Sequence, residues 1–127
     1  MIDPTHIDHP DVVVEALAAF EAYESALLAN DISSLDRWFW SDERLVRYGI
    51  AEVQHGAAAV AAWRAASPGV SPLRAHRRVT VTALGQDVAV IALEFANGED
   101  TSIGRQSQVW ARMSDGWRIL HAHVSML

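Results

Sequence analysis

The sequence predicts an α+β domain in which three N-terminal helices pack inside one curved antiparallel sheet. Apolar residues before Pro72 recur largely at helical spacing, whereas the chain after Pro72 contains four long strand-like segments. Two connections between these segments hold Asn97-Gly98 and Asp115-Gly116, dipeptides typical of β-hairpin turns. We therefore expect the four strands to follow one another as antiparallel neighbours and to curl into a cone around the first helix.

The order of the elements follows from the same signals. An apolar stripe over residues 11–29 predicts an amphipathic helix, which Pro10 starts and Asn30 ends. Asp31 can cap a short second helix that runs through Trp38. The remaining expected elements are strands 45–48 and 51–55, an alanine-rich helix over 56–66, and strands 77–84, 88–96, 103–113 and 117–125.

Composition excludes several classes of function. The chain has 127 residues, of which 50% are hydrophobic, and this predicts a single domain over 1–127. It contains no cysteine, which excludes disulfides, thiolate nucleophiles and cysteine zinc sites. Its ten basic residues are all arginine, which excludes Schiff-base catalysis and other lysine chemistry.

Charge and hydropathy bear on partners and location. The net charge of -6 argues against nucleic acid and anionic membranes as partners. No segment approaches the roughly 20 apolar residues that a membrane span needs. Residues 1–10 hold aspartates and histidines without an apolar run, so we expect no signal peptide and a cytoplasmic protein.

Strand alternation predicts which polar side chains share a cavity, because successive residues of a strand point to opposite faces. In the last strand we expect Trp117 in the core, which places His121 and His123 on the same inward face. In the preceding strand, Gln106 and Gln108 share one face. Inward polar residues on neighbouring strands indicate a cavity that binds a small molecule.

Three further residues are candidates for this cavity. Glu94 is the one charged residue within the apolar strand 88–96. Arg47 lies on one face of the first short strand, and Tyr23 lies on the apolar stripe of the first helix. We expect the guanidinium of Arg47 beside Tyr23 to favour the phenolate and so to lower the pKa of that phenol.

Each candidate also has a structural interpretation. Tyr23 can be a core residue whose hydroxyl finds a partner, and both glutamines can be hydrogen-bonded residues of the sheet or face solvent. Arg47 can form an ion pair with Glu94, Glu52 or Asp42.

A metal centre is not expected. His121 and His123 could supply two ligands from one strand face, but a metal site needs a third ligand and usually a fourth. No further histidine or carboxylate lies at a supporting spacing in the sequence. We therefore expect no metal and no organic cofactor.

Several segments resemble a known family. The last strands are similar to those of the NTF2-like (SnoaL-like) superfamily in Gly104-Arg105-Gln106-Ser107-Gln108-Val109-Trp110, Asp115-Gly116-Trp117-Arg118-Ile119 and His123-Val124-Ser125. Within that superfamily, four further segments resemble the AtzH-like proteins, a family that includes the oxalurate-catabolism protein HpxZ. These segments are Tyr23-Glu24-Ser25-Ala26-Leu27, Phe39-Trp40, Val46-Arg47-Tyr48-Gly49 and Trp63-Arg64.

The resemblance implies an NTF2-like cone and a decarboxylating amidohydrolase. Its substrate would be a small carboxylated urea such as carboxybiuret or dicarboxyurea, in cyanuric acid or oxalurate-type catabolism. The functional tyrosine and arginine of the family fall on Tyr23 and Arg47. From the strand alternation we expect Glu94, Gln106, Gln108 and His123 to bind substrate.

A second hypothesis is a non-catalytic, carboxylate-binding dimer that accompanies a larger amidohydrolase. The superfamily also contains isomerases with an acidic base, for which only Glu94 is a candidate here. In either case we expect a homodimer, because the chain combines an aromatic-rich segment around Trp38 with an exposed sheet face.

Overall fold

The computed structural model of the chain describes residues 1–99 and 102–127. After a 3-10 helix, η1 (Pro4–His6), the elements are α1 (Pro10–Leu28), α2 (Ile32–Trp38), β1 (Val46–Tyr48), β2 (Val53–His55), α3 (Ala57–Ala66), β3 (Ala75–Leu84), β4 (Val88–Ala96), β5 (Gly104–Met113) and β6 (Gly116–Met126). The predicted α+β class is confirmed. None of the described helices is long and apolar enough to cross a membrane.

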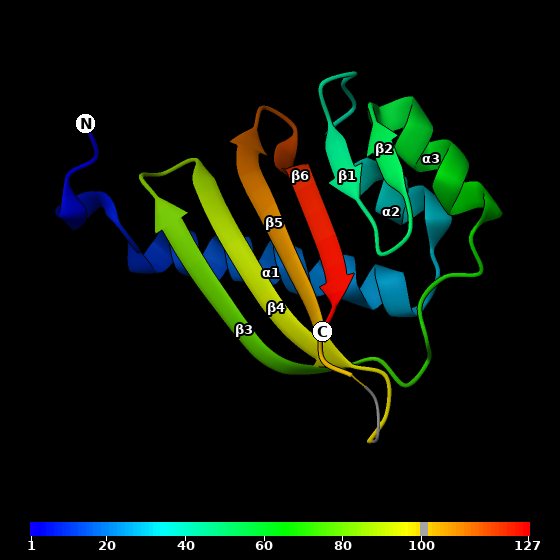
Figure 1. Cartoon of the computed structure of the whole chain (residues 1–127). Helices are drawn as coiled ribbons and strands as arrows, with labels where there is room; N and C mark the ends of the chain where they lie inside the picture. The colour runs from blue at the N-terminus through cyan, green and yellow to red at the C-terminus, as the bar shows by residue number, and fades with distance from the viewer. Residues whose placement is uncertain (100–101) are drawn as a thin grey trace.

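Within the described residues, the strands form one sheet in the order β2-β1-β6-β5-β4-β3. Strand β1 runs parallel to β6, and the other neighbouring pairs are antiparallel. The long strands curve around α1, while α2 and α3 lie together beside β1 and β2 (Figure 1). The sheet thus has a concave face that α1 covers and a convex face on the opposite side.

Helix α1 supplies the centre of the core. It starts with Pro10 in its first turn, where the missing N–H of proline costs no hydrogen bond. Its buried residues include Val12, Phe20, Tyr23 and Leu27, which recur at helical spacing on the face toward the sheet. Asp31 caps α2 as predicted: its side chain accepts a hydrogen bond from the backbone N–H of Ser34.

The prediction that Glu94 points into the cavity is wrong. Strand β4 buries Ala89, Ile91, Leu93 and Phe95, so Glu94 is exposed on the convex face. Both faces of this strand are apolar near its start, and choosing the wrong one inverts every later position. The larger apolar side chains mark the true core face.

The predicted alternation along β6, which put His121 and His123 on the core face with Trp117, is wrong because β6 contains a bulge. Ile119 pairs with Trp110, but the next paired residue of β6 is His121, opposite Val109. The one extra residue reverses the alternation beyond it. Ala122 is therefore the residue buried on the concave side, and the ring of His123 lies against Tyr48 instead.

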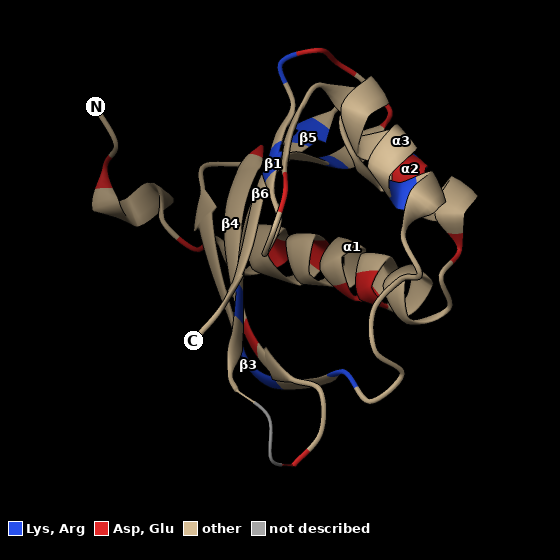
Figure 2. Cartoon of the chain, turned by 45° about the vertical axis from the view of Figure 1, so that its right-hand side comes forward, with Lys and Arg blue, Asp and Glu red and all other residues tan. Residues whose placement is uncertain are grey.

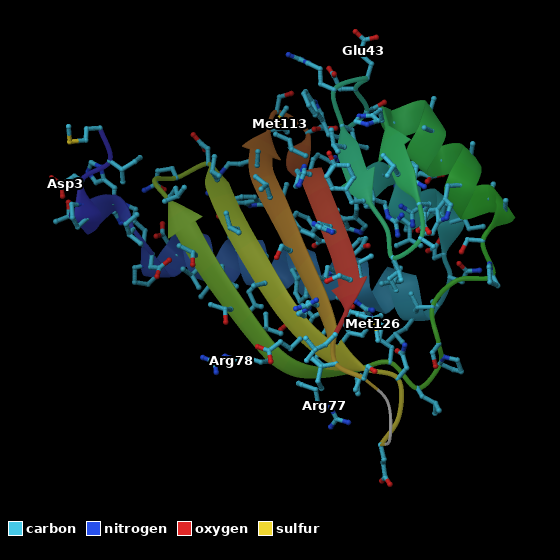
Figure 3. All side chains as sticks on the ribbon, in the orientation of Figure 1. Asp3, Glu43, Arg77, Arg78, Met113 and Met126 are labelled. Carbon is cyan, nitrogen blue, oxygen red and sulfur yellow. The ribbon has the colours of Figure 1, made fainter. Side chains whose placement is uncertain are left out.

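Strand β3 carries its own bulge near its start. The register between β3 and β4 shifts between His76 and Arg78. Arg77 and Arg78 project away from the sheet into solvent (Figure 3). These two arginines therefore do not contribute to the concave face.

Gly104 makes one packing contact of the core possible. A Cβ atom at this position would lie 2.2 Å from Cζ of Phe95, which is closer than real side chains approach. The guanidinium carbon of Arg74 in turn lies over the Phe95 ring, 4.0 Å from the ring centroid. We expect Gly104→Ala to lower the free energy of unfolding by about 1–3 kcal/mol through overpacking, measured by urea denaturation.

Gly85→Asn is the matched control for this variant. Gly85 has a φ of +60° with open space around its Cα, and asparagine tolerates that conformation. Its stability should stay within about 0.5 kcal/mol of the parent. An unchanged unfolding midpoint for Gly104→Ala would show that the Phe95 ring has room to move.

Candidate functional site

The concave side of the sheet holds a cavity of about 310 Å³. This volume suits a small organic molecule. Five of the predicted site residues line it: Tyr23, Arg47, Gln106, Gln108 and His123. The lining also includes the aromatic residues Phe39, Trp63 and Phe95 and two further arginines, Arg64 and Arg74.

Arg47 is held rigidly by β1 and its neighbours. Its Nη1 donates hydrogen bonds to Glu52 Oε1 at 3.0 Å and to Gln54 Oε1 at 2.9 Å. Its guanidinium lies over the ring of Trp63, 3.7 Å from the ring centroid. The expected ion pair with Glu52 therefore exists, and Arg47 lines the cavity at the same time.

Arg64 reaches the cavity from α3. Its Nε donates to Asp36 Oδ1 at 3.0 Å, and its guanidinium lies 4.9 Å from the centroid of the Phe39 ring. Its Nη2 is buried and has no hydrogen-bond partner among the described residues. The sequence analysis missed this residue, although Val60 and Arg64 are one helical turn apart on the buried face of α3.

Arg74 is held by a buried network that was not predicted. Its Nε and Nη2 donate to the two carboxylate oxygens of Glu24 at 3.0 and 3.4 Å, and Nη2 also donates to Gln106 Oε1 at 3.2 Å. The amide of Gln106 donates to Glu24 Oε2 at 3.2 Å, and His76 Nε2 lies 3.0 Å from Glu24 Oε1. The network joins α1 to β3 and β5.

Tyr23, on α1, is buried and lines the same cavity as these arginines. Its ring packs edge to face with the rings of Phe39 and Trp110, with both pairs of ring centroids 6.0 Å apart. Its hydroxyl forms no hydrogen bond with any described residue. It is thus a buried phenol whose polar end borders the cavity.

The expected lowering of the Tyr23 pKa is wrong. Burial raises the pKa of this phenol above its ordinary value of 10.0, and the charge of Glu24 raises it further. The charges of Arg64, Arg74 and Arg47 act in the opposite direction but are outweighed. At neutral pH Tyr23 is therefore a hydrogen-bond donor and a proton source rather than a phenolate.

The cavity is positive although the protein is acidic. Among the described residues, the charged lining consists of three arginines and a single carboxylate, Glu52, whereas the whole chain has a net charge of -6. The acidic residues of α1 lie along a helix that has no basic residue (Figure 2). The lining selects an anion, and planar guanidinium groups match a carboxylate in particular.

The two predicted glutamines line the cavity as buried, hydrogen-bonded residues. Gln108 accepts a hydrogen bond from Trp110 Nε1 at 3.0 Å, and Gln106 belongs to the Glu24 network. His123 borders the cavity, but it is exposed and its ring centroid lies 5.4 Å from that of Tyr48. Among the residues that the structure describes, no group of three or more histidines and carboxylates could hold a metal ion.

Comparison with solved structures places this α+β cone in the NTF2-like fold. A protein of unknown function from Pectobacterium atrosepticum, assigned to the DUF3225 family, is 42% identical over 100% of this chain and 99% of its own, with a TM-score of 0.95. A cystatin-like fold protein from Burkholderia xenovorans is 46% identical over 95% of each chain, with a TM-score of 0.92.

More distant structures show the same fold. An NTF2-like protein of unknown function from Pseudomonas putida is 20% identical over 89% of this chain and 84% of its own, with a TM-score of 0.76. The fold and the cavity thus define an NTF2-like protein with an arginine-lined pocket. The sequence profile of the AtzH-like family matches residues 5–127, and the chain belongs to this family. No curated protein sequence matches the chain significantly.

The raised pKa of Tyr23 can be measured as a difference between two proteins. Absorbance near the phenolate band is titrated for the parent and for Tyr23→Phe, and the difference isolates Tyr23. We expect its midpoint above pH 10. A midpoint below that value would mean that the arginines outweigh burial.

The same pKa shift predicts a loss of stability at alkaline pH. Below pH 10 both the folded and the unfolded chain keep the proton of Tyr23, so this residue adds no pH dependence. Above it, the unfolded chain releases the proton first, and the free energy of unfolding therefore falls. The free energy of unfolding of Tyr23→Phe should fall less steeply with pH in that range.

Proposed function

We propose that this protein is a decarboxylating amidohydrolase acting on a small carboxylated urea, such as carboxybiuret or dicarboxyurea. One observation carries the proposal. The unbonded phenol of Tyr23 borders the same cavity as Arg47 and Arg64, and each of these arginines has N–H groups that donate to no described residue. The cavity thus combines a proton source with carboxylate-binding groups.

Substrate binding follows from the fixed position of Arg47. Glu52 and Gln54 occupy its Nη1, while its Nε and Nη2 donate to no described residue. These two groups form one edge of the guanidinium and can hold a carboxylate through two parallel hydrogen bonds. Trp63 beneath the guanidinium limits its rotation.

The carboxylate that leaves as carbon dioxide is not the one that the arginines hold. An arginine clamp stabilises the charged carboxylate, whereas decarboxylation removes its charge, so clamping the reacting group would slow the reaction. The reacting carboxylate lies instead at the end of the cavity formed by Tyr23 and the ring of Phe39. A substrate with two anionic ends, such as dicarboxyurea, satisfies both requirements.

Bond cleavage needs one proton at the departing nitrogen. The bond between the urea nitrogen and the carboxyl carbon breaks, its electron pair goes to the nitrogen, and carbon dioxide leaves. Tyr23 donates its proton to that nitrogen as a general acid. Water then returns a proton to the phenolate, which the positive charges of the three arginines stabilise in the meantime.

A second candidate function is carboxylate binding without turnover, as a homodimer that accompanies an amidohydrolase. The carboxylate groups near the cavity favour it, because Glu52 and Glu24 are tied to Arg47 and Arg74 and neither is free to act as a base. Release of carbon dioxide distinguishes the two. The purified protein should produce carbon dioxide from dicarboxyurea faster than the spontaneous reaction, and a rate equal to the spontaneous one would leave only the binding function.

Tyr23→Phe tests the proton donor. Removing only the hydroxyl should lower turnover by about 10²-fold or more and leave substrate affinity nearly unchanged. Steady-state kinetics and the unfolding midpoint are measured on the same preparations. A variant that turns over like the parent would make Tyr23 a packing residue only.

Arg47→Lys tests the clamp. Lysine keeps the charge but loses the planar fork and the stacking on Trp63, so kcat/KM should fall about thirtyfold, equivalent to about 2 kcal/mol. Arg105→Lys, at an exposed position of β5, is the control and should match the parent. Equal kcat/KM for both variants would remove Arg47 from the site.

A further inference from the structure

We infer that Arg64 is a second anion-binding residue of the cavity, and that its buried Nη2 contacts the same carboxylate that Arg47 holds. This inference rests on the proposed function for the identity of the substrate, but not for the presence of an anion. It assigns to α3 a direct part in ligand binding.

The burial of Arg64 is the first observation. Its side chain is only 5% exposed, and its Nη2 finds no partner among the described residues. Buried polar groups in folded proteins are nearly always hydrogen-bonded, and an unsatisfied charged donor is costly. Because Arg64 lines the cavity, a ligand bound there can supply the partner that Nη2 lacks.

Comparison of the three arginines is the second observation. Arg74 is matched by the equally buried carboxylate of Glu24, both side chains being 4% exposed. Arg64 has only Asp36, which is 37% exposed and therefore screened by water, and it uses one Nε–H for that contact. Arg47 has Glu52, which is 29% exposed, and also donates to Gln54, so Arg64 is the arginine whose charge the protein itself compensates least.

Trp63 connects Arg64 to Arg47. The guanidinium carbon of Arg47 lies 3.7 Å from the centroid of the Trp63 ring, and that of Arg64 lies 6.0 Å from it. Two guanidinium groups beside one ring can address one anionic end of a small ligand. One oxygen of the carboxylate that Arg47 holds can accept a further hydrogen bond from Arg64, because each carboxylate oxygen has two lone pairs.

A purely structural role for Arg64 makes different predictions. In that case its bond to Asp36 would tie α3 to α2, and its loss would destabilise the fold without changing affinity. The functional role predicts the reverse, because replacing an unsatisfied buried charge by an apolar side chain removes a cost of folding. Stability and affinity measured on one variant therefore separate the two roles.

The test uses Arg64→Met, with Arg105→Met as the control of equal charge change on the convex face. Malonate, a non-reacting dicarboxylate, serves as the probe, with affinity measured by calorimetry. We expect Arg64→Met to bind it at least about tenfold more weakly, since each charge-assisted hydrogen bond lost is of that size. Its unfolding midpoint without ligand should equal or exceed that of the parent, and malonate should no longer raise it.

Three results would overturn the inference. These are malonate affinity of Arg64→Met within about twofold of the control, a lowered midpoint with affinity retained, and no binding of malonate by the unaltered protein. If Arg64→Met does not fold, a crystal structure of the unaltered protein with malonate decides the matter. A carboxylate oxygen within hydrogen-bond distance of Arg64 Nη2 supports the inference, and contacts to Arg47 or Arg74 alone contradict it.

Failure of the proposed function gives a different pattern. Malonate binding does not depend on turnover, so loss of affinity in Arg64→Met supports the inference even if dicarboxyurea is not decarboxylated. That combination would favour the binding function. Turnover with malonate affinity independent of Arg64 would leave the proposed function in place and remove only this residue.

Discussion

The buried ion pair between Glu24 and Arg74 is the contact on which the arrangement of the cavity depends. It joins the middle of α1 to the segment before β3, and Gln106 ties the same carboxylate to β5. A buried ion pair is tolerated when its remaining donors and acceptors are satisfied, and here His76 and Gln106 supply those partners. Because Tyr23 precedes Glu24 on α1, the pair also fixes the phenol.

The use of arginine as the only basic residue type suits this cavity. Each cavity arginine lies against an aromatic ring and is paired with a carboxylate, so little side-chain entropy remains to be lost when an anion binds. A lysine at any of these positions would keep the charge but neither the stacking nor the fixed direction of its donors. The positive region is therefore preorganised inside an acidic protein.

The elements could be predicted from the sequence more completely than the faces of the strands. Helical spacing, the Asp31 cap and the hairpin dipeptides are local signals, and the structure contains the corresponding elements. Glu94 was misplaced because both faces of β4 begin with apolar residues. The face of His121 was misjudged because a bulge leaves no local signal, whereas His123 borders the cavity as predicted. Glu24 and Arg74 are 50 residues apart, so their contact depends on the tertiary fold and lay beyond any pattern argument.

Burial affects the phenol of Tyr23 and the guanidinium of Arg64 in different ways, and both effects favour binding of an anion beside a protonated phenol. It raises the pKa of Tyr23, which keeps the proton on the phenol, and it leaves Arg64 with a charge that nothing nearby fully compensates. An anion that enters the cavity lowers the cost of burying Arg64, and its negative charge disfavours the phenolate further. Binding of an anion thus raises the pKa of Tyr23 further, so that the phenol keeps its proton until a basic nitrogen forms beside it. In the proposed reaction that nitrogen appears only as carbon dioxide departs, which couples proton transfer to bond cleavage.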